Sequence, residues 1–584
     1  MREDFSISKE RPSTFVVRQN ELEGRLDPSY YHPKTWKTLD ALENTSFEIK
    51  EIDAISKLVT KGESPLWRGD FFTKKGIPFL KGINVKEGRI TLENVVFIAE
   101  EVHKRMKRSQ LKPGNILLTM AGTLGDAAVV PDNLKEANIN QDLAKIVLNE
   151  DINPHYVSIF LNSIHGKLQV ERKSDGMTRR HINFVAIKSI KIPIPPRPIQ
   201  DRIAEIMEEA YKQRKEKLKE AEDLLAGIND YVLDKLGIAI PEVEEKKSFV
   251  VSLSDLKGGG RHDVFYYQPK YTVLTTQLET CHYEVAELKE IIKEISGGAT
   301  PRAKGDAYTN EKNGMPFLRI QNIGQGYIDL TDVKYITPEI HNTLLKRSQI
   351  NPKDILFTIT GRIGTTAVVP DKFGEANINQ HIVRMKIKGE VNPYYVEVIL
   401  NSSIGQIQSE RKTTGTTRIA LDYPSIKSIK IPVPPIEIQK EIATEVQCRR
   451  GLAKRLRGEA NEILEEAKKC VEWIIMGGEE KTRETIRLIA DKLKKSYNPE
   501  KIILYGSYAW GLPDEDSDID LLVIKDTKER PHDRIVNASR IISPLRRGYA
   551  VDIFVITPEE LKSRLEIGDQ FLQEIISRGE VLYG

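Results

Sequence analysis

The sequence contains few cysteines and no long apolar run. Three cysteines occur in 584 residues, Cys281, Cys448 and Cys470, and no two of them form a CxxC pair. This spacing predicts neither a disulfide framework nor a zinc site. No stretch approaches the roughly 18 consecutive apolar residues of a membrane-spanning helix, and the first residues lack the apolar core of a signal peptide. These absences favour a cytoplasmic protein with no membrane partner.

The chain also lacks an excess of charge of one sign. Charged residues make up 30% of the sequence, yet the formal net charge is only +3. This balance excludes a histone-like tail. It does not exclude local basic grooves, because nucleic-acid binding depends on where the charges lie. At about 150 residues per domain, the length predicts three to five domains.

What the sequence does contain is a long internal duplication. The segment "IKSIKIPIPP" from Ile187 matches "IKSIKIPVPP" from Ile426, and "EANINQ" occurs from both Glu136 and Glu375. Other paired segments, such as "NPHYVSIFLNS" and "NPYYVEVILNS", keep nearly the same offset. Few insertions therefore separate two copies of one ancestral unit.

Each copy has two parts of different character. The first part has short apolar runs broken by Gly, Pro and Asn, which predicts strands with some helix. A double proline ends this part, since it cannot continue a central strand or the body of a helix. The second part has a 4-3 apolar spacing that is typical of a coiled coil. An ordinary long core helix is the alternative, but two copies favour an antiparallel pair that packs together.

Two similar domains at a fixed separation suit a ligand with repeating geometry, such as double-stranded DNA. Basic residues at matching positions are candidates for phosphate contacts, and residues that differ between the copies are candidates for reading different bases. For each single residue, the alternative is a solvated side chain or an internal salt bridge. The candidate DNA-binding residues are Lys81, Asn84, Arg172, Lys173, Arg179, Arg180, Arg302, Arg319, Asn322, Arg411, Lys412 and Arg418.

The duplicated part resembles the specificity subunit of type I restriction–modification systems. The resemblance rests on "LDPSYYHP", the Gly-x-Ser/Thr-Pro turns at Gly62 and Gly298, the "EANINQ" segments, and "IKIPIPP" followed by "IQDRIAEI". It implies two target-recognition domains, held apart by two antiparallel helices, that each read half of a bipartite DNA site. It also implies docking of methyltransferase subunits, which carry S-adenosylmethionine, and of a restriction subunit.

The repeats themselves show no catalytic motif. They contain neither an Asn/Asp-Pro-Pro-aromatic methyltransferase motif nor the GxxxxGK[ST] phosphate loop of a translocase. We therefore expect no cofactor for the repeats, and we expect the chemistry of such a complex to come from partner subunits.

The tail carries a pattern for handling phosphates. One apolar run ends in the turn Gly506-Ser507, and a second begins with Asp518 and Asp520. On a strand these two carboxylates lie on one face, where they repel each other unless a cation such as Mg²⁺ neutralises them. A third apolar run carries Asp552, which is costly to bury unless it is paired or metal-bound. The pattern favours metal-assisted nucleotidyl transfer, and the alternative is three surface acids at strand ends.

This tail is similar to the minimal nucleotidyltransferases of the polymerase-beta superfamily, which have Gly-Ser, a short gap, Asp-x-Asp and a third acid on a later strand. The resemblance implies Mg²⁺ and a nucleoside triphosphate as cofactors. It assigns the triphosphate to Gly506 and Ser507, the metal to Asp518, Asp520 and Asp552, and activation of the acceptor to Asp552.

The tail departs from that family at two positions. The family often has an arginine between the serine and the second glycine, where this chain has Tyr508 and Trp510. How the domain binds the triphosphate, and which nucleotide it prefers, therefore stay undecided by the sequence. In antitoxin-like members the acceptor is a partner protein, which gives a second hypothesis: a nucleotidyltransferase targeted or regulated by the DNA-binding repeats. A third hypothesis treats the repeats as a protein-interaction scaffold.

The predicted fold class is α+β with several domains. Two tandem α/β target-recognition domains are each followed by a long helix, and the helices form an antiparallel coiled-coil pair. A small α/β domain with the nucleotidyltransferase fold ends the chain. The predicted boundaries are 14–198 and 248–437 for the recognition domains, 199–237 and 438–477 for the spacer helices, 238–247 for a linker and 480–584 for the nucleotidyltransferase-like domain.

Overall fold

The computed structural model divides into two compact units, one formed by Met1–Lys215 with Ala460–Gly584 and the other by Glu216–Glu459. Most of the predicted linker and most of "LDPSYYHP" lie outside the described residues. The described residues are 31, 39–40, 42–86, 88–175, 180–240, 248–254, 256, 264–301, 307–414, 419–546 and 548–584.

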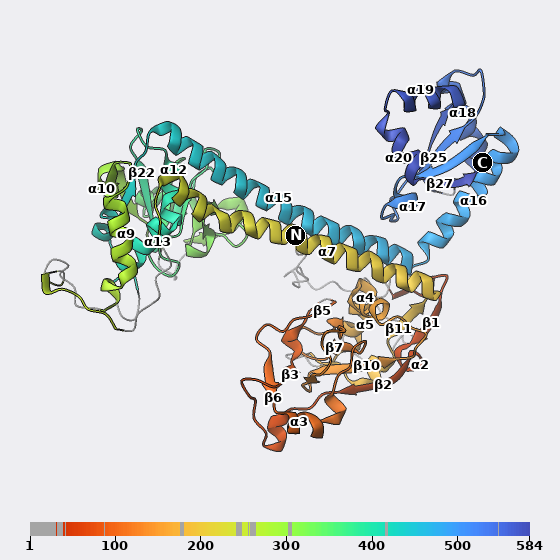
Figure 1. Ribbon diagram of the computed structural model, residues 1–584, viewed down its shortest axis with the longest axis horizontal. Helices are drawn as coiled ribbons and strands as arrows, with labels where there is room; N and C mark the ends of the chain where they lie inside the picture. The colour runs from red at the N-terminus through yellow and green to blue at the C-terminus, as the bar shows by residue number, and fades with distance from the viewer. Residues whose placement is uncertain are drawn as a thin grey trace. The chain divides into compact units, whose positions relative to one another are not determined.

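The first repeat is built around an antiparallel four-stranded sheet in the order β2-β10-β7-β8 (Figure 1). A three-stranded sheet, β6-β3-β9, and the pairs β1-β11 and β4-β5 complete its strands. The strands are β1 Glu48–Glu51, β2 Ser56–Lys61, β3 Ile77–Leu80, β4 Val85–Lys86, β5 Arg89–Ile90, β6 Val96–Ile98, β7 Ile116–Thr119, β8 Ala127–Val129, β9 Asn138–Ile139, β10 Leu143–Leu148 and β11 Lys191–Ile194. The helices are α2 Ile52–Ile55, α3 Glu100–Arg105, α4 Pro154–Asn162, α5 Ile164–Lys173 and α6 Phe184–Lys188.

The second repeat has the same main sheet, in the order β13-β22-β19-β20. Its second sheet, β14-β18-β15-β21, has one extra edge strand, and β12-β23 and β16-β17 are pairs. The strands are β12 Val285–Glu287, β13 Ile292–Gly297, β14 Tyr308–Thr309, β15 Met315–Leu318, β16 Ile323–Gly324, β17 Tyr327–Ile328, β18 Lys334–Ile336, β19 Ile355–Thr358, β20 Thr366–Val368, β21 Asn377–Ile378, β22 Ile382–Ile387 and β23 Lys430–Pro432. The helices are α9 Pro269–Glu279, α10 Leu288–Ile291, α11 Pro338–Asn342, α12 Pro393–Asn401, α13 Ser403–Arg411 and α14 Tyr423–Lys427.

Both faces of each main sheet are buried, which explains the short and uniformly apolar strands. Successive side chains on a strand point to opposite faces. On β7, Ile116 and Leu118 therefore join one core while Leu117 joins another. On β19, Ile355 and Leu356 divide in the same way between two cores. The predicted mixture of strands and helices in the repeats is confirmed, with main sheets that are antiparallel.

The repeated "PP" segment marks the junction between strand and long helix in both copies. The strands β11 and β23 end just before it, and the long helices α7 (Arg197–Leu236) and α15 (Ile436–Ile475) begin just after it. A buried glutamine fixes each junction. The Gln200 side chain accepts the Asn153 N–H at 2.9 Å and donates to the Pro195 carbonyl at 2.8 Å. Gln439 makes the matching bonds, also at 2.9 and 2.8 Å.

The long helices α7 and α15 pack against each other in an antiparallel manner, as predicted. In the first unit, Ile203 near the start of α7 shares a core with Ile474 near the end of α15. In the second unit, Ala221 of α7 packs with Ala453 and Leu456 of α15. Small and apolar side chains at these positions let the two backbones approach closely. No helix in the described parts of the chain is long and apolar enough to cross a membrane.

The C-terminal domain has a four-stranded sheet in the order β26-β25-β24-β27, in which only β25 and β26 run parallel. Helices α16 and α18 pack on one face, and α19 and α20 pack on the other. The strands are β24 Lys501–Tyr505, β25 Ile519–Ile524, β26 Val551–Ile556 and β27 Glu580–Tyr583. The helices are α16 Gly478–Tyr497, α17 Ser507–Trp510, α18 Pro531–Ile542, α19 Pro558–Glu566 and α20 Gln570–Arg578.

A buried ion pair joins α12 to α15 in the second unit. The Arg450 guanidinium donates to both Glu397 carboxylate oxygens, at 2.8 and 3.0 Å, and Glu397 is only 2% exposed. Burial raises the pKa of Glu397, and the charge of Arg450 opposes that shift. The first repeat has Ser158 and Tyr211 at the matching positions, so the pair belongs to one copy alone.

We predict that Arg450→Ala destabilises the second unit by about 3–5 kcal/mol at neutral pH, because it leaves a buried carboxylate without its cation. The loss should shrink as the pH falls to the ordinary glutamate pKa of 4.5, because the raised pKa of Glu397 leaves its buried carboxyl neutral there. The double variant Glu397→Ser, Arg450→Tyr copies the first repeat and should cost much less. Hydrogen exchange of the α12 amides measures both, and equal losses in the two variants would contradict the prediction.

Candidate functional site

Two of the predicted catalytic aspartates lie side by side at one end of the C-terminal sheet. Asp520 of β25 pairs in register with Asp552 of β26. Asp518 lies two residues before Asp520, just outside β25, and is exposed. Leu522 continues the Asp520 face of β25 and packs in the core beneath α19 and α20. The two paired aspartates therefore face the same side of the sheet as these helices.

Negative charge accumulates at this end of the sheet. The pKa of Asp520 is raised to about 6, chiefly by burial and in smaller part by the charges of Asp552 and Asp518. Asp518 and Asp552 are themselves exposed. A site with this imbalance favours a bound cation over a second anion.

The turn after β24 approaches the carboxylates as closely as a backbone can. Tyr505, the last residue of β24, pairs with Asp520. Gly506 follows with a φ of 71°, and a Cβ placed there would lie 2.0 Å from Asp520 Oδ2. Only glycine combines this conformation with this approach. Ser507 then begins α17, so the predicted Gly506-Ser507 turn does lie beside the acids.

The predicted metal ligands are only partly brought together. Within the described ranges, no group of three or more His, Cys, Asp or Glu side chains is arranged to hold a metal ion. The Asp520–Asp552 pair still fits Mg²⁺ that arrives with a nucleotide. Such an ion usually binds one or two carboxylates and completes its shell with water and phosphate oxygens.

An aromatic wall lies next to the acids. Tyr505 stacks on Trp510 with ring centroids 6.5 Å apart, and it meets Phe571 of α20 edge-on at 5.7 Å. The pKa of Tyr505 is raised to about 12, chiefly by burial and in smaller part by the charges of Asp520 and Asp552. Sequence analysis singled out neither Tyr505 nor Phe571. The signal for Tyr505 was its position directly before Gly506.

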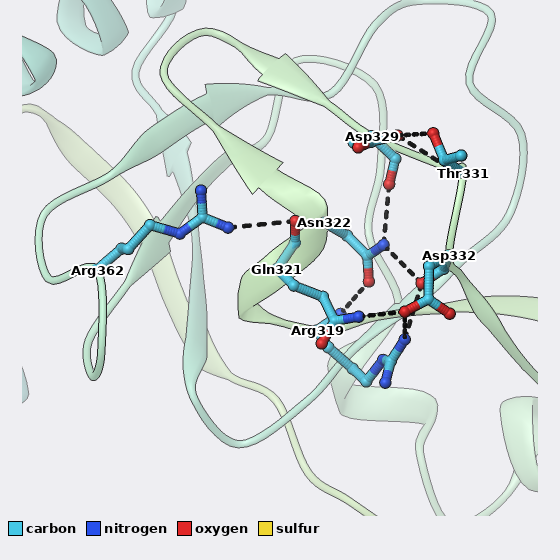
Figure 2. A network of polar contacts seen from close by, with 7 residues as sticks. All are labelled: Arg319, Gln321, Asn322, Asp329, Thr331, Asp332 and Arg362. Atoms are coloured by element: carbon cyan, nitrogen blue, oxygen red, sulfur yellow. Dashed lines mark hydrogen bonds and ion pairs between the residues drawn. The ribbon is translucent and has the colours of Figure 1, made fainter. Parts of the chain in front are cut away.

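A second candidate site is a tight turn that both repeats share. In the second repeat, the buried Asn322 side chain accepts the Arg319 N–H at 2.9 Å and donates to the carbonyls of Asp329 and Asp332 at 2.9 and 3.1 Å (Figure 2). Asn84 makes three matching bonds in the first repeat, at 2.9, 3.1 and 3.2 Å. The side-chain amides of Asn84 and Asn322 are thus bonded within their own turns. This placement does not support their predicted contacts with DNA.

The tips of these two turns carry different side chains. Ile83 is 64% exposed in the first repeat, and its counterpart Gln321 is exposed in the second. The neighbouring β19–β20 loop adds Arg362, which donates to the Gln321 carbonyl at 3.2 Å (Figure 2) and to the Ile320 carbonyl at 3.4 Å. The first repeat has Thr123 at that position. Sequence analysis missed these four residues, although they are differences inside otherwise matching segments.

Two of the predicted phosphate contacts lie at the base of the turns. Arg319 donates to the Asp332 carbonyl at 2.7 Å and forms an ion pair with its carboxylate at 3.2 Å. Its side chain is only 22% exposed. The matching Lys81 lies over the Phe72 ring, 4.8 Å from its centroid. Arg319 thus holds its own turn together, whereas Lys81 is held by an aromatic face.

The matched basic pair at the ends of α5 and α13 has internal partners. Lys173 donates to Ser189 at 2.9 Å and Lys412 donates to Ser428 at 2.8 Å. Burial lowers the pKa of Lys412. These bonds fix each helix to the segment before the "PP" junction. For these two lysines the structure supports an internal contact, which was the alternative to DNA binding.

The other predicted DNA contacts are distributed around the same helix ends. Arg411 stacks on Tyr266 at 4.5 Å, and its Nε–H donates to the Tyr266 carbonyl at 3.2 Å. Arg172 is half-buried at the end of α5. Arg180 is exposed and forms an ion pair with Glu171 at 2.7 Å. The predicted residues outside the described ranges are Arg179, Arg302 and Arg418.

Comparison with known families identifies both parts of the chain. The chain belongs to the family of the type I restriction modification DNA specificity domain, whose sequence model matches residues 40–222 and 282–447. A nucleotidyltransferase domain matches residues 486–578. The first match covers most of both repeats, and the second covers strands β24, β25 and β26 of the sheet that carries Asp520 and Asp552.

Three individual proteins illustrate what the chain is similar to. The EcoBI specificity subunit of Escherichia coli is 23% identical over 56% of this chain and 65% of its own length, which is less than two thirds of that protein. A candidate protein adenylyltransferase of Methanocaldococcus jannaschii, MJ0604, is 34% identical over 17% of this chain and 94% of its own length. A solved chain from a type I R-M system shares 14% identity over 74% of this chain and 96% of its own length, with a TM-score of 0.46.

The raised pKa of Asp520 predicts a stability that depends on pH. Its folded pKa of about 6 exceeds the ordinary 3.8, so the stability it contributes at low pH is lost as the pH rises through about 6. Asp520→Asn should therefore stabilise the C-terminal domain by about 1 kcal/mol at pH 7.5, a figure reduced for solvent screening, and by much less at pH 4, close to the ordinary pKa.

Thermal unfolding of the full chain at the two pH values measures this effect. Asp526→Asn is the matched control, because Asp526 is exposed and follows the opposite end of β25. Equal stabilisation by Asp520→Asn at both pH values would contradict the prediction. It would show that the stabilisation does not come from removing the buried negative charge of Asp520.

Proposed function

We propose that this chain is the DNA-specificity subunit of a type I restriction–modification complex, in which each repeat reads one half of a bipartite DNA site. The observation that carries the proposal is the pair of matching turns. Both have the same backbone, with Lys81 at φ −119° and ψ 170° and Arg319 at −115° and 168°. Two identical scaffolds present different side chains, as reading two different half-sites requires.

The chemistry of the tips differs in a way that suits base readout. Ile83 offers an apolar contact of the kind that recognises a thymine methyl group. Gln321 and Arg362 offer donors and acceptors that suit the major-groove edges of adenine and guanine. Thr123 in the first repeat is shorter than Arg362 and carries no charge. We infer that the two halves of the site have different sequences.

The proposal includes partners that carry the chemistry. Methyltransferase subunits with S-adenosylmethionine and a restriction subunit would act on the DNA that the repeats select. The absence of methyltransferase and translocase motifs in the sequence of the repeats supports this division of roles, as does membership of the specificity family.

We predict that exchanging the turn tips changes one half of the recognition site at a time. Gln321→Ile with Arg362→Thr gives the second repeat the side chains of the first, and should alter only one half of the methylated motif. The reciprocal Ile83→Gln with Thr123→Arg is the matched control and should alter only the other half. Sequencing of methylated bases reads the result. A methylated motif unchanged by both exchanges would exclude the tips as base-reading residues.

A second activity is favoured by the Asp520–Asp552 pair in a domain of the nucleotidyltransferase family. We propose that this domain transfers a nucleotide to a hydroxyl group of a partner protein. Mg²⁺ bound by Asp520 and Asp552 would neutralise the phosphates of the nucleotide. The acceptor oxygen would bond to the α-phosphorus while the bond to the β-phosphate oxygen breaks. Pyrophosphate would leave, and Asp552 would take the hydroxyl proton.

We predict that the full chain labels a partner protein when it is incubated with Mg²⁺ and ATP labelled on the α-phosphate. Asp518→Ala with Asp520→Ala should reduce the label by about a hundredfold or more, since the metal and its charge partner are lost. Asp526→Asn should leave the label unchanged. Retention of the label in the double variant would assign the transfer to another site.

A further inference from the structure

An arginine is held on the aromatic wall of the C-terminal domain. The Arg578 guanidinium carbon lies 5.2 Å from the centroid of the Trp510 ring. Its side chain is 52% exposed, and Nη1 donates to Glu574 at 2.6 Å. Arg578 ends α20 and Trp510 ends α17, so two separate elements meet at this contact.

The wall connects this arginine to the acids. Trp510 stacks on Tyr505, and Tyr505 pairs across the sheet with Asp520. Helix α20 is fixed on the same face, because Leu572 and Ile575 lie in the core that contains Trp510 and Tyr505 at its edge. Arg578 therefore belongs to the same face of the sheet as the carboxylates, next to the turn that carries Gly506.

The charge of a nucleotide cannot be balanced by this end of the sheet alone. The pKa of Asp520 is raised by burial and by two further negative charges. A bound nucleoside triphosphate would add several negative charges to this end of the sheet. A guanidinium suits phosphate because its planar N–H groups bind two oxygens at once. Stacking on an indole ring orients the plane while its N–H edge stays accessible.

We propose that Arg578, positioned by Trp510, binds the phosphates of the nucleoside triphosphate. The inference rests on the proposed nucleotidyl-transfer function of this domain. The existing partner of Arg578 does not prevent this role. Glu574 lies one helical turn away and is itself 48% exposed, and such surface pairs contribute little and exchange readily.

A second stacked arginine on this face is already committed to the fold. Arg564 lies over Phe554 at 5.6 Å, but its Nη2 forms an ion pair with Asp569 at 2.5 Å. Asp569 is only 16% exposed, and its other oxygen caps α20 through the Leu572 N–H. Arg564 therefore holds α20 in place, which leaves Arg578 as the better phosphate ligand of the two.

The test measures binding to the full chain with three probes: ATP with Mg²⁺, inorganic triphosphate with Mg²⁺, and adenosine. Arg578→Ala should weaken the binding of ATP and of triphosphate by about tenfold or more, because charge-assisted hydrogen bonds are lost. It should leave adenosine binding unchanged, and Arg578→Lys should keep part of the affinity. Arg540→Ala is the matched control. Arg540 is exposed on α18, which packs on the opposite face of the sheet, and its replacement removes the same charge.

The outcomes separate this inference from the function on which it rests. Unchanged triphosphate affinity in Arg578→Ala would overturn the role of Arg578 while leaving the domain a nucleotide-binding one. A weaker affinity for adenosine with unchanged affinity for triphosphate would overturn it too, because Arg578 would then stack on the base. Failure of the wild-type chain to bind ATP with Mg²⁺ would contradict the proposed function itself. Thermal unfolding of each variant confirms that the domain is folded.

Discussion

The buried asparagine amide beneath each turn is the interaction on which the two recognition surfaces depend. Asn84 and Asn322 each satisfy three backbone groups from within, so the same internal bonds set the backbone of both turns although their tips differ. In the second repeat the Gln321 side chain also donates to the Asp332 carboxylate at 2.5 Å. A buried amide that lost these bonds would pay its full desolvation cost, which makes the turn rigid. Tip residues such as Ile83 and Gln321 can therefore differ while the geometry that presents them stays the same. Under the proposed function, duplication followed by change at the tips would give two DNA-reading surfaces on one scaffold.

The C-terminal domain uses the opposite principle, because its site is built on an interaction that opposes folding. Asp520 and Asp552 lie side by side, and the charges that shift the pKa of Asp520 are both negative. Gly506 brings the backbone close to Asp520. Packing of α16 and α18 on one face and of α19 and α20 on the other holds the strands in register despite this repulsion. Protonation of Asp520 relieves the repulsion at low pH, and at neutral pH a bound cation would do so. The site is therefore arranged for a charged ligand at a cost in stability.

Periodicity and repetition were enough to predict the larger features of the chain. The duplication, the junction at the double prolines and the antiparallel long helices follow from patterns that local chemistry dictates, and the turn at Gly506 lies beside Asp520 as expected. Single side chains were harder. Asn84, Lys173 and their counterparts were matched between copies because they shape the repeats, and sequence alone could not separate that role from DNA contact. Ile83 was not singled out at all, since only tertiary structure shows that it is exposed. The distance between Asp518 and the other acids depends on a loop whose path no periodicity fixes.

The central claim is that one rigid scaffold, present in two copies in the chain, reads two different DNA half-sites. Mapping methylated bases across the genome of the source organism, with and without this gene, tests that claim most directly. The account predicts that deletion removes one gapped motif whose two halves differ in sequence. Loss of a motif with two identical halves would contradict the role of the differing tips, and an unchanged methylation pattern in cells that express active methyltransferase partners would contradict the specificity function itself.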